Sequence, residues 1–161
     1  MGKNVLIIGA SGGIGRAIAQ QLGSHGHSLI LHYYKNKEAI AELGQQLEQQ
    51  TILMTVQCDL RKEEDVTKLV ESIPFQIDAV IFAGGITYHG LLQDTENDVI
   101  DELIAIHVRA PIIITRDILK QMIQRRFGQI IFISSIWGNI GASHEVVYSS
   151  VKGAQNSFVK A

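Results

Sequence analysis

Residues 5–15 read Val-Leu-Ile-Ile-Gly-Ala-Ser-Gly-Gly-Ile-Gly, a short apolar run that passes directly into a glycine-rich turn. The run predicts a buried β-strand, and the apolar spacing at 16–22 predicts a helix after the glycines. Gly9 permits a tight turn, Gly13 lets backbone N–H groups approach a pyrophosphate, and Gly15 lets helix and strand pack closely. A flexible strand-to-helix turn is the alternative interpretation of the glycines. The buried strand and amphipathic helix on either side favour a dinucleotide site, with the following candidate contacts: Gly9, Ser11, Gly12, Gly13, Ile14 and Gly15.

Four more short apolar runs recur along the chain, at residues 29–31, 53–56, 79–82 and 130–133. Helical patterns lie between them, at residues 38–48, 63–72 and 98–124. This alternation predicts an α/β fold of the Rossmann type, a doubly wound parallel sheet in three layers with strands buried on both faces. Ligands of such sheets bind beyond the carboxyl ends of the strands. Pro111 lies inside the longest helical pattern and is expected to bend it.

The composition indicates one globular domain over residues 1–161, with 46% hydrophobic and 19% charged residues. The net charge of −2 offers no bulk positive charge for nucleic acid, and the apolar runs are too short to span a membrane. Cys58 is the single cysteine, so no internal disulfide forms, and no zinc-ligand spacing occurs. We therefore expect a cytoplasmic protein without a metal, nucleic-acid or membrane partner.

The segment after the second run decides the expected nucleotide. NAD-specific Rossmann proteins place an acidic side chain there, which binds the adenosine ribose and repels a 2′-phosphate. Residues 31–37 read Leu-His-Tyr-Tyr-Lys-Asn-Lys and contain no acid. Lys35 and Lys37 favour NADP(H) over NAD(H), and Tyr33 or Tyr34 is expected to line the adenosine. The alternative is that the two lysines are solvated surface residues.

The candidate catalytic residues follow the fifth run, where residues 134–138 read Ser-Ser-Ile-Trp-Gly. Tyr148 and Lys152 are four residues apart, so a helix places them on one face, one turn from each other. A neighbouring ammonium stabilises a phenolate and brings the pKa of the phenol from about 10 toward working pH. Tyr148 is therefore the candidate acid, and Ser135 is placed to polarise a substrate carbonyl. A Tyr-x-x-x-Lys spacing alone is typical of an ordinary helix surface.

Together, the Gly-x-x-x-Gly-x-Gly spacing, Ser134-Ser135 and Tyr148-x-x-x-Lys152 resemble the short-chain dehydrogenase/reductase family over the whole chain. The resemblance implies a carbonyl reductase in which a nicotinamide delivers hydride and Tyr148 delivers the proton. It implies that Lys152 holds the nicotinamide ribose, that Asp59 bonds the adenine amino group and that Leu60 lines the adenine ring. The alternative for Asp59 is a helix cap. Further expected cofactor contacts are Ala83, Gly84, Gly85, Tyr148 and Lys152.

Two segments depart from the family pattern. Residues 82–85 read Phe-Ala-Gly-Gly where most members have Asn-Asn-Ala-Gly, which removes side-chain hydrogen bonds that tie strand ends together. His107 stands where members usually carry an asparagine that supports a water-linked proton relay to the lysine. A histidine can relay protons near neutral pH, so His107 is a candidate relay residue. The alternative is a half-buried histidine with satisfied hydrogen bonds.

Residues 31–33, 107–108, 134–138 and 152–160 are similar to a bacterial subgroup near the 3-oxoacyl-acyl-carrier-protein reductases. That subgroup includes the elongation factor P 5-aminopentanone reductases, so the implied substrate is a small or carrier-bound ketone. A non-catalytic nucleotide-sensing domain remains an alternative, as does an epimerase or dehydratase.

The family also implies a homo-oligomer, a dimer or tetramer. Family chains commonly run to about 250 residues, so we expect this sequence to be a fragment without the last strands and to turn over slowly or not at all.

Overall fold

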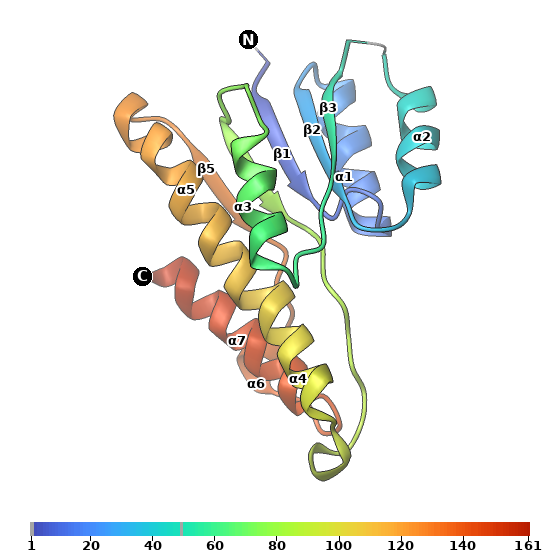
Figure 1. Ribbon diagram of the computed structural model, residues 1–161, viewed down its shortest axis with the longest axis vertical. Helices are drawn as coiled ribbons and strands as arrows, with labels where there is room; N and C mark the ends of the chain where they lie inside the picture. Colours follow the sequence, from blue (N-terminus) through green and yellow to red (C-terminus); the bar gives the residue numbers. More distant parts are fainter. Residues whose placement is uncertain (1, 49) are drawn as a thin grey trace.

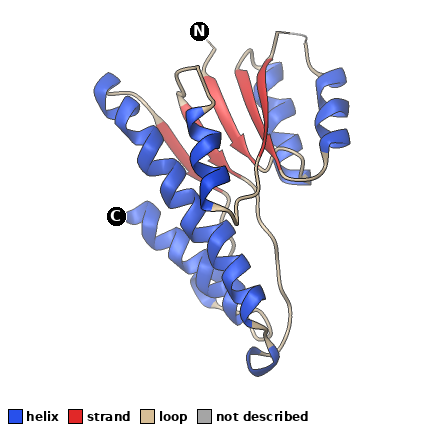
Figure 2. Cartoon of the chain, in the orientation of Figure 1, coloured by secondary structure: helices blue, strands red, loops and turns tan. Residues whose placement is uncertain are grey.

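The computed structural model describes residues 2–48 and 50–161 and contains one parallel sheet with the strand order β3-β2-β1-β4-β5 (Figures 1 and 2). Every neighbouring pair of strands is parallel. The predicted Rossmann-like α/β fold is confirmed. The strands are β1 (Asn4–Ile8), β2 (Ser28–Tyr33), β3 (Ile52–Gln57), β4 (Ala79–Phe82) and β5 (Gln129–Phe132).

The helices that connect the strands confirm the predicted alternation. The predicted helices at 16–22, 38–48 and 63–72 correspond to α1, α2 and α3, whereas the short helices η1 and α6 were not predicted. No helix in residues 2–48 and 50–161 is long and apolar enough to cross a bilayer. The bounds are α1 (Gly13–Ser24), α2 (Lys37–Gln46), α3 (Glu63–Glu71), η1 (Leu92–Asp94), α4 (Asn97–Ile104), α5 (Ala110–Arg125), α6 (Trp137–Ile140) and α7 (Val146–Lys160).

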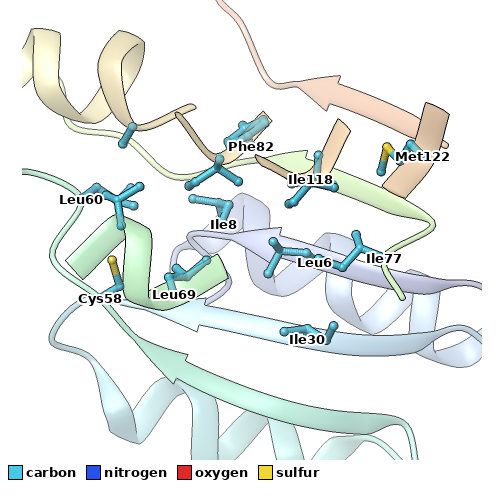
Figure 3. Close-up of a cluster of buried hydrophobic side chains, with 14 residues drawn as sticks. Leu6, Ile8, Ile30, Cys58, Leu60, Leu69, Ile77, Phe82, Ile118 and Met122 are labelled. Carbon is cyan, nitrogen blue, oxygen red and sulfur yellow. The ribbon is translucent and has the colours of Figure 1, made fainter. Parts of the chain in front are cut away.

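Alternate residues of the central strands enter two hydrophobic clusters on opposite faces of the sheet. Leu6 and Ile8 of β1 pack with residues of α3 and α5, in the cluster drawn in Figure 3. Val5 and Ile7 of the same strand pack with residues of α1 and α2. This period of two is that of a strand covered on both sides. Burial of the apolar side chains therefore fixes which helices cover each face.

The two edge strands differ from the expectation that all five strands are buried on both faces. Residues of β3 are mostly half-buried, and those of β5 alternate between exposed and half-buried. Ile131 of β5 is 41% exposed. The prediction was wrong for these strands because an apolar run indicates a strand but does not tell whether it lies at the centre of the sheet or at its edge.

The long helix predicted at 98–124 is interrupted at its middle. A π-helical segment, η2 (Ala105–Arg109), joins α4 to α5, and Pro111 lies at the start of α5. Proline has no N–H to donate to the carbonyl four residues earlier, which is that of His107. The expected disturbance of the helix thus takes the form of a π-helical turn, and it leaves the His107 carbonyl without its usual helical donor.

Gly15 lets α1 approach the end of β1. A Cβ atom built on Gly15 would lie 2.2 Å from the carbonyl oxygen of Gly9 and 2.9 Å from Cα of Ala10. Both of these are backbone atoms, which a rotamer change cannot move. Gly13 begins the same helix, and a Cβ built there would meet nothing within 4 Å.

We predict that Gly15→Ala destabilises the protein by about 2–4 kcal/mol, because the methyl group forces the helix away from the strand. Gly13→Ala is the matched control and should leave stability unchanged or raise it by up to about 1 kcal/mol. Urea unfolding without nucleotide measures both values. Equal stabilities of the two variants would contradict this account of the packing.

Candidate active site

A cleft of about 250 Å³ opens where the order of the strands reverses, at the carboxyl ends of β1 and β4. This is the place where open parallel sheets bind ligands. Eight of the residues expected to contact the cofactor line the cleft. They are Gly9, Ser11, Gly12, Asp59, Leu60, Ala83, Gly84 and Gly85.

The glycine turn leaves room for a ligand at the N-terminus of α1. Gly9 has a φ of +86°, and the N–H of Gly12 donates to its carbonyl at 3.1 Å. A Cβ on Gly9 would lie 2.2 Å from Cα of Gly84, so the ends of β1 and β4 can lie this close only because residue 9 has no side chain. The space in front of Gly13 is open, and Ile14 is exposed. The turn therefore fits the expected dinucleotide, whose phosphates would meet free backbone N–H groups.

A buried histidine joins three strand ends beside this turn. His32 Nδ1 accepts from the N–H of Gly9 at 3.0 Å, so its Nε2 carries the proton and donates to the carbonyl of Cys58 at 3.0 Å. Burial lowers the pKa of His32 to about 4, which keeps the ring neutral near pH 7. The ring thus links the ends of β1, β2 and β3 by hydrogen bonds, in a chain that lacks the asparagines usual after β4.

An ion-pair network closes the other end of the cleft. Arg61 Nε and Nη2 donate to the two carboxylate oxygens of Asp59 at 2.8 and 2.7 Å, and Nη1 donates to Glu102 at 2.9 Å. The hydrogen bonds from Arg61 hold the pKa of Asp59 below its usual range. The helix that follows, α3, has no side-chain cap, so Asp59 binds Arg61 instead of capping α3. Arg61 also donates to the Tyr34 hydroxyl.

Of the two neighbouring tyrosines, Tyr34 lines the cleft, whereas Tyr33 packs into the hydrophobic cluster beneath α1 and α2. Tyr33 is the last residue of β2, whereas Tyr34 lies in the bend that follows the strand. Lys35 Nζ lies 4.8 Å from the centroid of the Tyr34 ring, next to the cleft. Lys35 and Lys37 are both exposed.

The three expected catalytic residues lie around the end of β5. Ser135 follows this strand, and its Oγ accepts from the N–H of Trp137 at 3.2 Å. Tyr148 and Lys152 share one face of α7, as predicted, and Lys152 Nζ lies 5.7 Å from the centroid of the Tyr148 ring. Lys152 is buried, and its Nζ donates to the carbonyl of Ile133 at 2.9 Å and to Gln155 Oε1 at 3.2 Å. Burial lowers the pKa of Lys152, an effect that these acceptors oppose.

His107 lies beside Tyr148, and the two rings meet edge to face with centroids 5.7 Å apart. The ring is 1% exposed, and its Nε2 lies 2.8 Å from the carbonyl oxygen and 3.2 Å from the nitrogen of Ile86. Burial lowers the pKa of His107 to about 4. Its Nδ1 is buried without a hydrogen-bond partner. The backbone carbonyl of the same residue accepts from Gln155 Nε2 at 2.7 Å.

Comparison with known proteins identifies the family of this chain. The family model "short chain dehydrogenase" matches residues 3–161. The chain belongs to the short-chain dehydrogenase family. Among curated members of this family, it is 44% identical over 162 residues to the "Uncharacterized oxidoreductase YmfI" of Bacillus subtilis, covering 99% of this chain and 67% of that protein. It is 36% identical over 151 residues to a 3-oxoacyl-[acyl-carrier-protein] reductase FabG of Rickettsia typhi, covering 94% of this chain and 61% of that protein.

Solved structures of the short-chain dehydrogenase family share the fold. A short-chain dehydrogenase from Streptomyces avermitilis superposes with a TM-score of 0.93 at 26% identity, covering 99% of this chain and 59% of that one. A 3-oxoacyl (acyl-carrier-protein) reductase from Agrobacterium tumefaciens with NADP bound gives a TM-score of 0.89 at 24% identity, covering 98% of this chain and 62% of that one. The chain thus spans about three fifths to two thirds of the length of the curated relatives that it matches.

Sequence reasoning missed three side chains that contribute to the site. His32 and Arg61 make their contacts across strands and helices far apart in the sequence, so no local spacing reveals them. Gln155 lies three residues after Lys152, a spacing that places both on one helix face and that offered a signal. A glutamine at such a spacing is common on exposed helix surfaces, and only its burial distinguishes this one.

We predict that the protein loses stability in acid because His32 and His107 stay neutral in the fold. Each has a folded pKa of about 4 against 6.5 for a free histidine, so the unfolded chain binds the extra protons. Stability is therefore fully present above about pH 6.5 and falls as the pH is lowered toward 4. The two rings together account for roughly 3–4 kcal/mol between pH 7 and pH 5.

Urea unfolding at pH 7, 6 and 5 measures this dependence. His107→Asn should remove about half of it, whereas His25→Asn, at an exposed histidine, should leave it intact. Equal stability of the unaltered protein at pH 7 and pH 5 would contradict the assignment of two buried neutral rings.

Proposed function

We propose that the protein carrying this chain is an NADPH-dependent carbonyl reductase with Tyr148 as its acid. The observation that supports the proposal most strongly is the buried ammonium of Lys152, which is held by the carbonyl of Ile133 and by Gln155 on the helix face that carries Tyr148. A buried cation costs free energy unless acceptors replace its lost water, and buried titratable groups held in this way are typical of functional sites. Here its Nζ lies 5.7 Å from the centroid of the Tyr148 ring, and eight of the residues expected to bind the dinucleotide line the cleft at the ends of β1 and β4.

Three side chains of the site have defined roles in the proposed reduction. Ser135 donates a hydrogen bond to the substrate carbonyl, and Tyr148 transfers its hydroxyl proton to the carbonyl oxygen. Lys152 stabilises the phenolate that remains and also binds the nicotinamide ribose. The bound nicotinamide nucleotide supplies hydride to the carbonyl carbon. The glycine turn at 9–15 would hold its pyrophosphate, and Asp59 and Leu60 its adenine.

We assign a positioning role to His107, in place of the proton relay that its sequence position suggested. Its Nε2 is engaged with the backbone of Ile86, and its lowered pKa of about 4 disfavours proton uptake near pH 7. The ring packs against Tyr148 and limits the positions that the phenol can take. Its backbone carbonyl is the group directed toward Lys152, through Gln155.

The charges next to the cleft support NADP(H) as the nucleotide, with NAD(H) less suited. Lys35 lies beside Tyr34, and residues 31–37 contain no acid that would repel a 2′-phosphate. A structural neighbour from Agrobacterium tumefaciens was solved with NADP bound. Arg61 adds a guanidinium at the same end of the cleft, although Asp59 and Glu102 engage it.

For the substrate we propose a ketone, either a 3-oxoacyl thioester on a carrier or the 5-aminopentanone modification of elongation factor P. The similarity to 3-oxoacyl-[acyl-carrier-protein] reductases supports the first.

We further propose that the protein is cytoplasmic, since its single cysteine is unpaired. We also propose that it forms a homo-oligomer, since α5 and α7 expose the apolar side chains of Ile112, Ile123 and Val159. The intact set of Ser135, Tyr148 and Lys152 favours an enzyme over a domain that only senses the nucleotide.

We predict that, in the full-length protein, Tyr148→Phe lowers the rate of NADPH oxidation with an acetoacetyl thioester by roughly 10³-fold, because the proton donor is lost while the ring is kept. Absorbance at the nicotinamide band follows the reaction. Tyr88→Phe, which also removes one phenol, is the matched control and should keep the rate. Equal rates for the Tyr148 variant and the unaltered protein would remove Tyr148 from the mechanism.

We predict that Lys35→Ala raises the Kd for NADPH about fivefold and that for NADH less than twofold, because the side chain faces a phosphate that only NADPH carries. Titration of nicotinamide fluorescence measures both constants. The exposed Lys120 on α5 provides the control Lys120→Ala, which should change neither constant. An equal loss of affinity for both nucleotides would contradict the role of Lys35 in selecting NADPH.

A further inference from the structure

Gln155 is a buried amide that connects two elements of the site. Its side chain lies on α7 one turn after Lys152, and the residue is 4% exposed. Its Oε1 accepts from Lys152 Nζ at 3.2 Å, and its Nε2 donates to the carbonyl of His107 at 2.7 Å. The amide therefore joins the lysine to the π-helical turn between α4 and α5.

The direction of this amide is fixed by the backbone of that turn. In a regular helix the N–H of residue 111 would donate to the carbonyl of His107, but Pro111 has no N–H. This carbonyl accepts from Gln155, and of the two ends of that amide only the NH₂ group can donate. The carbonyl end of the amide is then left to face Lys152 as an acceptor.

We propose that Gln155 is a positioning residue whose amide holds the Lys152 ammonium in the orientation that serves Tyr148. The inference rests on the proposed function and extends it by one residue. An ammonium has three N–H donors. One is taken by the carbonyl of Ile133 and one by Gln155, so the two acceptors together fix the direction of the third.

Two titratable aromatic side chains lie near this ammonium. Lys152 lies beside the Tyr148 ring on α7, and His107 of the π-helical turn packs against the same ring. Burial disfavours the charged form of Lys152, and the two acceptors favour it. Removing the Gln155 acceptor therefore leaves the ammonium less stabilised and free to rotate away from the phenol.

The test is Gln155→Met, which keeps the length of the side chain and removes both hydrogen bonds. The pKa of Lys152, followed by NMR of its ¹⁵N-labelled Nζ, should fall further by about half a unit or more. In the whole enzyme, kcat for ketone reduction should fall about tenfold, with KM for the nucleotide changed less than twofold. Gln121→Met on α5 is the matched control, since Gln121 Oε1 accepts from the N–H of Ile77 at 3.3 Å, outside the proposed site.

An unchanged pKa of Lys152 in Gln155→Met would overturn the inference. The NMR titration needs no turnover, so this result is separate from the Tyr148→Phe assay, which tests the proposed function. If the Met variant does not fold, hydrogen exchange of side-chain amides in the unaltered protein provides a second test. The Gln155 amide should exchange at least about tenfold more slowly than that of the exposed Gln124, and equal rates would overturn the inference.

Discussion

The site depends on keeping one positive charge inside the protein, the ammonium of Lys152. A buried ammonium is stable only where acceptors replace the water that it has lost. Here β5 supplies the carbonyl of Ile133, and α7 supplies Gln155. The Gln155 amide is in turn fixed by the carbonyl of His107, which is available because Pro111 has no N–H to donate. The π-helical turn, the edge strand and α7 are thus joined at the point where the chemistry is proposed.

Two buried histidines hold the remaining parts of the site together. His32 bonds the glycine turn after β1 and the end of β3, and His107 bonds the backbone at Ile86 after β4. Both rings have a lowered pKa because they are buried. Residues 82–85, after β4, lack the asparagines that are usual in the family. In this chain the imidazoles of His32 and His107 form the hydrogen bonds between the strand ends.

The sequence predicted those features that local patterns encode. The apolar runs located all five strands, and the spacing of Tyr148 and Lys152 placed both on one helix face. The same runs did not reveal that β3 and β5 are edge strands, because sheet order depends on how crossovers pack. Likewise, the sequence did not show which of the two adjacent rings, Tyr33 or Tyr34, lines the cleft. Arg61 and Gln155 acquired their roles only through partners distant in the sequence, Glu102 and the carbonyl of His107.

A crystal structure of the protein with NADP⁺ bound would test the central claim most directly. The account predicts the pyrophosphate at the N-terminus of α1, the adenine between Tyr34 and Leu60, and the nicotinamide next to Tyr148 with its ribose on Lys152. It also predicts that Lys152 Nζ keeps its contacts to Ile133 and Gln155. A nucleotide bound outside the cleft, or a Tyr148 hydroxyl directed away from both the nicotinamide and Lys152, would contradict the account.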